Sequence, residues 1–266
     1  MALFPTLILY SAITLREVYS VFFLLIALNG IAKFIENKSF TSLLQIAIGF
    51  YILTLFHGPL AIGGFVFLFY FIIIKLKEIA SRLLDLKINL LTFLLFMVLL
   101  VPIIIFINYG IKLPYIGKFE DVINPIYLIQ QSNFGFRGEA SYPDWLVINE
   151  TYEIFTKTLL RAFYFFYSPF VWEIKKISHA FGFIDGTFYF VITIYLFKNW
   201  RALWSNPTTR IFLLILITYL IIYGLGIANF GTGFRHRSKF VVILILLAAP
   251  KLPYFIFPSI KKLYKI

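Results

Sequence analysis

The stretch IFLLILITYLIIYGLGIAN, residues 211–229, runs for 19 residues without an Asp, Glu, Lys or Arg. About 20 helical residues of this kind cross the hydrocarbon layer of a bilayer, which is about 30 Å thick. The whole chain has the same character, because 61% of its 266 residues are hydrophobic, 20% are aromatic and only 14% are charged. A soluble protein would have to leave much of this apolar surface in water. The sequence therefore indicates an integral membrane protein of the all-α class.

Other apolar stretches of similar length predict a polytopic protein with about seven transmembrane helices, in a single transmembrane domain covering residues 1–266. The second and third spans meet at His57, Gly58 and Pro59, so they form either a tight hairpin or one broken helix. Residues 1–15 are apolar but short and interrupted, and we expect an interfacial or re-entrant helix there. The predicted spans are 17–34, 42–56, 60–76, 89–109, 180–197, 211–229 and 239–257.

The only extensive polar stretch lies between the fourth and fifth spans, in residues 110–179. Its first part carries six acidic residues and predicts a loop outside the membrane. Its second part, TLLRAFYFFYSPFVWEI, residues 158–174, is aromatic and predicts a helix lying in the membrane interface.

The distribution of Lys and Arg predicts the orientation of the spans. With the turn near residues 35–41 in the cytoplasm, the inner short segments hold twelve basic residues and the outer ones four, as the positive-inside tendency requires. Residues 110–179 and the opening stretch are then extracytoplasmic. The inner basic residues are Lys33, Lys38, Lys75, Lys77, Arg82, Lys87, Lys198, Arg201, Arg210, Lys261, Lys262 and Lys265, and the outer ones are Arg16, Arg235, Arg237 and Lys239.

Composition argues against several classes of function. The chain has no cysteine and three histidines, which excludes thiolate chemistry and does not favour a His-rich metal site, so we expect neither a metal nor a cofactor. In a membrane protein, a formal net charge of +12 serves topology and anionic lipid head groups. We therefore expect membrane lipids as partners and no nucleic acid.

The segment RHRSK, residues 235–239, concentrates three of the four outer charges at the start of the predicted last span. A helix N-terminus repels cations, so an anion should compensate them. Two guanidinium forks beside free helix N–H groups describe a phosphate or pyrophosphate site, and the phosphates of a membrane interface belong to lipids. The other interpretation is that these side chains snorkel to ordinary phospholipid head groups and set the depth of the span.

Three segments carry a resemblance to a known family. FGTGFRHRSKFVVILILLAA, residues 230–249, resembles the entry to the last span in membrane proteins of bacterial surface-polysaccharide clusters and in GT-C type polyprenyl-phosphate-dependent glycosyltransferases. LFPTLILYSAITLREVYSVFFLL, residues 3–25, and RAFYFFYSPFVWEI followed by GFIDGTFYF resemble other segments of such proteins. The likeness is most specific at Arg16-Glu17, Tyr167-Ser168-Pro169-Phe170 and Arg235-His236-Arg237.

The resemblance implies a multi-pass protein of the bacterial inner (plasma) membrane that acts in surface-polysaccharide or glycolipid biosynthesis. Its partner would be a polyprenyl-phosphate-linked sugar at the extracytoplasmic face, together with other polysaccharide-assembly proteins. The acidic catalytic motif that this family carries in its first outer loop is absent from the sequence, which leaves the catalytic residues unassigned. We therefore expect either an N-terminally shortened glycosyltransferase or a relative with another function. The alternative class is a non-catalytic transporter or assembly subunit for a lipid-linked glycan.

The candidate binding residues fall into two groups. The predicted ligands of the lipid phosphate are Arg235, His236, Arg237 and Lys239, and further possible substrate contacts are Arg16, Glu17, Arg137, Asp144 and Trp145. The last three lie in NFGFRGEASYPDW, residues 133–145, whose mixture of aromatic and polar side chains suits a sugar ring. A loop that packs its aromatics onto the membrane-side surface would explain that segment equally well.

Overall fold

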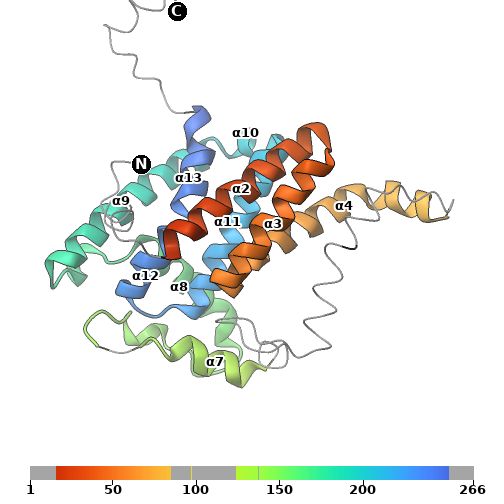
Figure 1. Cartoon of the computed structure of the whole chain (residues 1–266). Helices are drawn as coiled ribbons and strands as arrows, with labels where there is room; N and C mark the ends of the chain where they lie inside the picture. The colour runs from red at the N-terminus through yellow and green to blue at the C-terminus, as the bar shows by residue number, and fades with distance from the viewer. Residues whose placement is uncertain (1–15, 85–96, 98–123, 137, 252–266) are drawn as a thin grey trace, which may run out of the picture.

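The computed structural model describes residues 16–84, 97, 124–136 and 138–251, and this part of the chain is helical (Figure 1). Its one β feature is an isolated bridge between Ser141 and Asn229, so the all-α class is confirmed for the described residues. The α-helices are α2 (Arg16–Asn37), α3 (Phe40–Phe56), α4 (Ile62–Leu84), α7 (Pro125–Asn133), α8 (Glu153–Tyr167), α9 (Ile177–Lys198), α10 (Trp200–Ser205), α11 (Pro207–Gly226), α12 (Phe230–Arg237) and α13 (Val241–Ala248). Four 3-10 turns are η1 (Gly58–Ala61), η2 (Asp144–Leu146), η3 (Val171–Glu173) and η4 (Ala249–Lys251).

Three described helices, α2, α9 and α11, are long and apolar enough to cross a membrane. The chain is therefore a membrane protein by the length and composition of its helices. Two shorter apolar helical stretches, Phe40–Phe56 and Gly58–Ile74, accompany them. The predicted span 89–109 and the predicted helix in residues 1–15 lie outside the described residues, and seven spans remain a prediction.

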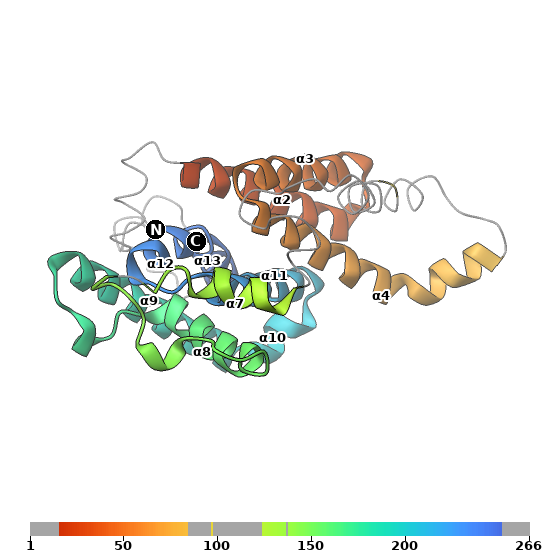
Figure 2. The ribbon, with the colours of Figure 1, turned by 90° about the horizontal axis from the view of Figure 1, so that it is seen from below.

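Helix α11 is the centre of the packing. It contacts α2, α4, α8 and α13, and its start is fixed by Asn206, whose side chain accepts a hydrogen bond from the backbone N–H of Thr208 at 2.9 Å. Figure 2 shows α2 and α3 on one side of α11 to α13, with α8 on the other. The last helices of the chain therefore hold the first helices and the 124–176 segment together.

Helices α2 and α3 form a hairpin through Lys38 and Ser39. Lys38 lies in the left-handed region, with φ 47°, and the Ser39 side chain accepts a hydrogen bond from the backbone N–H of Ser42 at 3.2 Å. The two helices approach closely, because a Cβ on Gly49 would lie 2.8 Å from the Cβ of Ala27. Small residues at such contacts are a common means of packing helices in membranes.

The chain reverses direction at His57, which settles whether α3 and α4 are one broken helix. Phe50 of α3 packs against Gly64 near the start of α4. Further along α4, Phe67 contacts Phe34 near the end of α2, with ring centroids 5.8 Å apart. Helices α3 and α4 are therefore separate helices joined by a turn.

The helix ends that the Lys and Arg distribution assigns to the outer side meet one another in the fold. Phe34 near the end of α2 contacts Phe67 in the first third of α4, and Arg210 near the start of α11 donates a hydrogen bond to the Tyr70 hydroxyl of α4 at 3.3 Å. The contacts between outer ends join Glu17 to Arg235, Tyr19 to Phe56, His57 to Tyr223, and Ser141 to Asn229.

Impermeant thiol labelling tests the orientation, and the absence of cysteine from the sequence gives a clean background. We expect the Tyr152→Cys variant to be labelled on intact cells, because Tyr152 is exposed and belongs to the segment that is predicted to lie outside. The Arg201→Cys variant should be labelled only after the membrane is permeabilised, since exposed Arg201 belongs to a segment that is predicted to lie inside. The cysteine-free protein is the control, and the reverse labelling pattern would contradict the topology.

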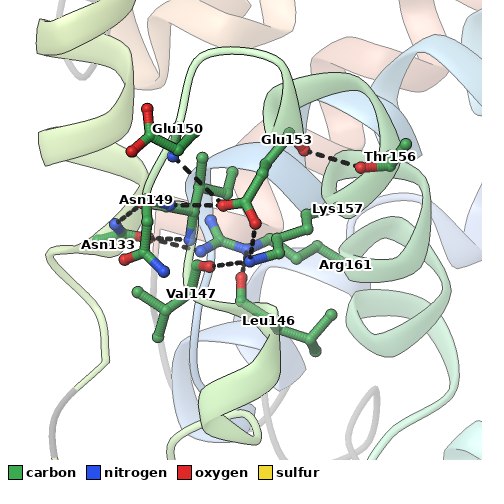
Figure 3. A network of polar contacts seen from close by, with 10 residues as sticks. Asn133, Leu146, Val147, Asn149, Glu150, Glu153, Thr156, Lys157 and Arg161 are labelled. Atoms are coloured by element: carbon green, nitrogen blue, oxygen red, sulfur yellow. Dashed lines mark hydrogen bonds and ion pairs between the residues drawn. The ribbon is translucent and has the colours of Figure 1, made fainter.

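The described part of the 110–179 segment folds around one buried arginine, Arg161 of α8 (Figure 3). Its guanidinium donates hydrogen bonds to the carbonyls of Leu146, Ser132 and Leu225 at 2.8, 3.1 and 3.1 Å. It also donates to the side-chain oxygen of Asn133 at 2.7 Å. These contacts join α7, η2, α8 and α11, so the segment is a packed part of the fold.

Helix α8 differs in its bounds from the predicted interfacial helix. It begins at Glu153, whose carboxylate accepts hydrogen bonds from Lys157 and from the backbone N–H of Asn149, and these hold the pKa of Glu153 below its ordinary value (Figure 3). It ends at Tyr167, before Pro169. The outward face carries the exposed side chains of Phe155 and Leu159, the pattern of a helix that borders lipid.

Candidate anion-binding site

The RHRSK segment spans the end of one helix and the turn to the next. Arg235 and Arg237 lie in the last turn of α12, and Lys239 lies in the turn before α13, which begins at Val241. The prediction that the arginines stand at the start of the last span is therefore wrong. The start of α12 is capped by Asn229, which accepts a hydrogen bond from the backbone N–H of Thr232 at 2.8 Å. The cations instead occupy a helix C-terminus, where the helix dipole favours positive charge.

Arg237 belongs to the protein core. It is fully buried, and its guanidinium donates hydrogen bonds to the backbone carbonyls of Phe166, Ser168 and Gly182. The guanidinium carbon also lies 4.8 Å from the ring centroid of Phe234. Arg237 thus ties α12 to α8 and α9, and we assign it no part in ligand binding.

Arg235 points to a different place, the start of α2. Its Nε donates a hydrogen bond to Oε1 of Glu17 at 2.6 Å. The same carboxylate oxygen lies 3.7 Å from Nε of Arg16 and 3.9 Å from Nζ of Lys239. We call Arg16, Glu17, Arg235 and Lys239 the cation cluster. The structure thus brings four of the nine predicted site residues together in the cluster, from two ends of the sequence, and a fifth, His236, contacts Lys239.

The cation cluster gathers three basic side chains around one carboxylate. Arg16, Arg235 and Lys239 all lie within 4 Å of Oε1 of Glu17. The arrangement is layered, because Glu17 and Lys239 are 2% and 1% exposed whereas the side chains of Arg16 and Arg235 are 34% and 35% exposed. The two guanidinium groups therefore form the outer layer.

Two histidines and a tyrosine pack against the cluster from the protein interior. Nζ of Lys239 lies 3.0 Å from Nδ1 of His236. An ammonium group can only donate, so Nδ1 accepts, and the ring proton of a neutral His236 is on Nε2. The ring of His57 lies 4.9 Å from that of His236, and its Nδ1 is 2.9 Å from the hydroxyl of Tyr223. These contacts fix the buried side chains beneath the guanidinium groups.

The predicted sugar contacts of the 133–145 segment lie elsewhere. Asp144 opens the η2 turn and is exposed, and Trp145 packs its ring edge-on against Tyr164, with centroids 5.7 Å apart. In the described chain, no hydrogen bond or ion pair joins either residue to the cation cluster. Arg137 lies outside the described residues.

Sequence reasoning missed the parts that His57 and Tyr223 play. The sequence predicts His57 at the junction of two spans, and in the structure it caps the end of α3. Its contact with Tyr223 joins positions 166 residues apart, and a lone Tyr in an apolar helix gives no local signal of such a partner.

Metal chemistry and known relatives add no further assignment. Within the described residues, no group of three or more His, Cys, Asp or Glu lies together as a metal site would require. Comparisons with family models, with curated proteins and with solved structures found no match to this chain. Among the described residues, the cation cluster is therefore the feature from which we infer a function.

Proposed function

We propose that this protein binds the phosphate group of a polyprenyl-phosphate-linked sugar at the cation cluster and acts in surface-polysaccharide or glycolipid biosynthesis, in the manner of GT-C glycosyltransferases. The observation that carries the proposal is the convergence of three cations on a single carboxylate oxygen. The membrane character of three helices and the resemblance of the RHRSK and Arg16-Glu17 segments add support.

The gathering of basic side chains favours an anionic ligand. Lys239 is almost completely buried, and among the described residues it shares the Glu17 carboxylate with two arginines. The partly exposed guanidinium of Arg235 makes one hydrogen bond to this carboxylate and can also donate to a phosphate. Charge-assisted hydrogen bonds from guanidinium to phosphate are among the stronger polar contacts in proteins.

The layered arrangement argues against snorkelling as a complete explanation. Snorkelling requires a long side chain that extends toward head groups, which Arg16 and Arg235 can do. Lys239 does the opposite, because its ammonium turns inward to Glu17 and His236. The cluster therefore has the features of a binding site in addition to those of an anchor.

The site lies at the ends of two apolar helices, since Glu17 is in the first turn of α2 and Tyr223 is in the last turn of α11. Phosphates at this level of a membrane protein are those of lipids, which favours a lipid-linked phosphate as the ligand. Glu17 is held by three cations, which stabilise its ionised form and weaken it as a base. This charge arrangement supports phosphate binding by the cluster more directly than it supports acid–base catalysis by Glu17.

The Arg235→Lys variant tests the proposal. We expect it to bind polyprenyl phosphate in nanodiscs about tenfold more weakly, because an ammonium group retains the charge but cannot present a planar fork to phosphate. Binding can be measured by titration into nanodiscs of neutral lipid. Arg201→Lys is the matched control, because Arg201 is exposed and lies before the start of α11. Tyr223, which lies beneath the cluster, is in the last turn of the same helix, and this helix is about 30 Å long. Equal affinities of the wild type and both variants would contradict a phosphate site at Arg235.

A further inference from the structure

Glu17 holds Arg235 in one specific way. Its Oε1 accepts a hydrogen bond from Nε of Arg235 at 2.6 Å. Nε is the guanidinium nitrogen that is bonded to the aliphatic part of the side chain. In the described part of the chain, this is the one hydrogen bond that the Arg235 side chain makes. A guanidinium group has five N–H donors in a rigid plane, so the contact with Glu17 leaves the terminal nitrogens as donors for another group.

The position of Glu17 places it behind the two arginines. Glu17 is 2% exposed, whereas Arg235 and Arg16 are each about one-third exposed, so a ligand that arrives from the surface meets the guanidinium groups first. Its second oxygen, Oε2, is buried and makes no hydrogen bond among the described residues. The carboxylate is therefore oriented by Oε1 alone, on the side that faces the cations.

Arg16, Arg235 and Lys239 meet at one acceptor atom of the cluster, Oε1 of Glu17. With Glu17 in place, they are gathered within 4 Å of one oxygen before any ligand binds. Glu17 is itself fixed by the first turn of α2, where the helix dipole favours a carboxylate. Such pre-organisation increases affinity because less ordering remains to be done on binding.

We propose that Glu17 is a positioning residue of the phosphate site: it holds Arg235 by the Nε side and turns its terminal nitrogens toward the ligand, without contacting the phosphate itself. This inference rests on the proposed function. It makes the distance from the α2 backbone to the carboxyl oxygen more important than the negative charge.

A pair of variants separates distance from charge. Glu17→Gln retains an oxygen at the same reach that can accept from Nε of Arg235, but has no charge. Glu17→Asp retains the charge but is shorter by one methylene group. We expect Glu17→Gln to bind polyprenyl phosphate within about threefold of the wild type, or more tightly, and Glu17→Asp to bind roughly tenfold more weakly, the effect of one lost charge-assisted contact.

The measurement uses the full chain in neutral-lipid nanodiscs, titrated with polyprenyl phosphate in one arm and with inorganic pyrophosphate in the other. Tighter binding of the lipid indicates a lipid-linked ligand, and equal binding indicates a site for phosphate from either source. Stronger binding by Glu17→Asp than by Glu17→Gln, equal changes in both, or no change in either would overturn the positioning role. If Arg235→Lys also leaves the affinity for polyprenyl phosphate unchanged, the proposed function itself fails. If Arg235→Lys lowers this affinity but Glu17→Asp binds more tightly than Glu17→Gln, only the positioning role is rejected.

Discussion

The Arg161→Met variant should lose about 3–5 kcal/mol of the free energy of unfolding. Arg161 is fully buried, and its guanidinium supplies donors to three backbone carbonyls and to Asn133. Burial lowers its pKa to about 10, so it remains charged at neutral pH. Methionine fills similar space but leaves the buried carbonyls without these donors, at about 1–3 kcal/mol for each unsatisfied group.

Reversible unfolding in mixed micelles of detergent and SDS, followed by tryptophan fluorescence, can measure this loss. Arg161→Lys should have an intermediate free energy of unfolding, because one ammonium group cannot donate to all four of the acceptors that surround the planar guanidinium group. Arg201→Met is the control for loss of an arginine at an exposed position of α10. A stability of Arg161→Met within 1 kcal/mol of the wild type would show that the network contributes little.

The long apolar helices could be predicted from the sequence because hydropathy alone specifies them. The predicted spans 17–34, 180–197 and 211–229 correspond to α2, α9 and α11, with ends displaced by a few residues. Helix ends depend on local caps that a hydropathy pattern does not describe. Helix α11, for example, begins at Pro207 because Asn206 caps it, four residues before the predicted span.

Helix α12 could not be predicted from hydropathy. Its sequence, FGTGFRHR, contains two glycines and three basic or titratable side chains, and has little tendency to form a helix alone. The Asn229 cap and the contacts of Arg237 with carbonyls of α9 and the end of α8 hold it in place. The Arg237 contacts are tertiary, and the helix that they hold places the arginines at a helix C-terminus instead of at the expected N-terminus.

The candidate site was predictable in part. The sequence predicts both Arg16-Glu17 and the RHRSK segment as candidate binding residues, but the hydrogen bond that joins Arg235 to Glu17 connects positions 218 residues apart. The different roles of Arg235 and Arg237 could not be predicted from the sequence either, because both are basic residues in the same predicted outer segment. Burial separates them, since Arg237 is fully enclosed and Arg235 reaches the surface.

The Gly224→Ala variant should lower the free energy of unfolding by about 2–3 kcal/mol, although alanine favours helix over glycine by about 1 kcal/mol. A Cβ at this position would lie 2.5 Å from the backbone N and Cα of Ala162, so α8 and α11 would have to separate. Backbone atoms cannot move aside as the end of a side chain can. Small residues allow the backbones of membrane helices to approach closely, so a larger residue at such a contact weakens the packing between the helices.

The same helix provides the control, because a Cβ at Gly226 meets nothing within 4 Å and Gly226→Ala should be neutral in stability. Separation of α8 from α11 should also reach the cation cluster. Phe165 of α8 stacks on Tyr223, with ring centroids 5.9 Å apart, and the Tyr223 hydroxyl pairs with His57 beside His236. We therefore expect Gly224→Ala, unlike Gly226→Ala, to weaken polyprenyl phosphate binding severalfold under conditions where both proteins are folded. Equal stability of the two variants would show that the contact of Gly224 with Ala162 does not set the distance between these helices.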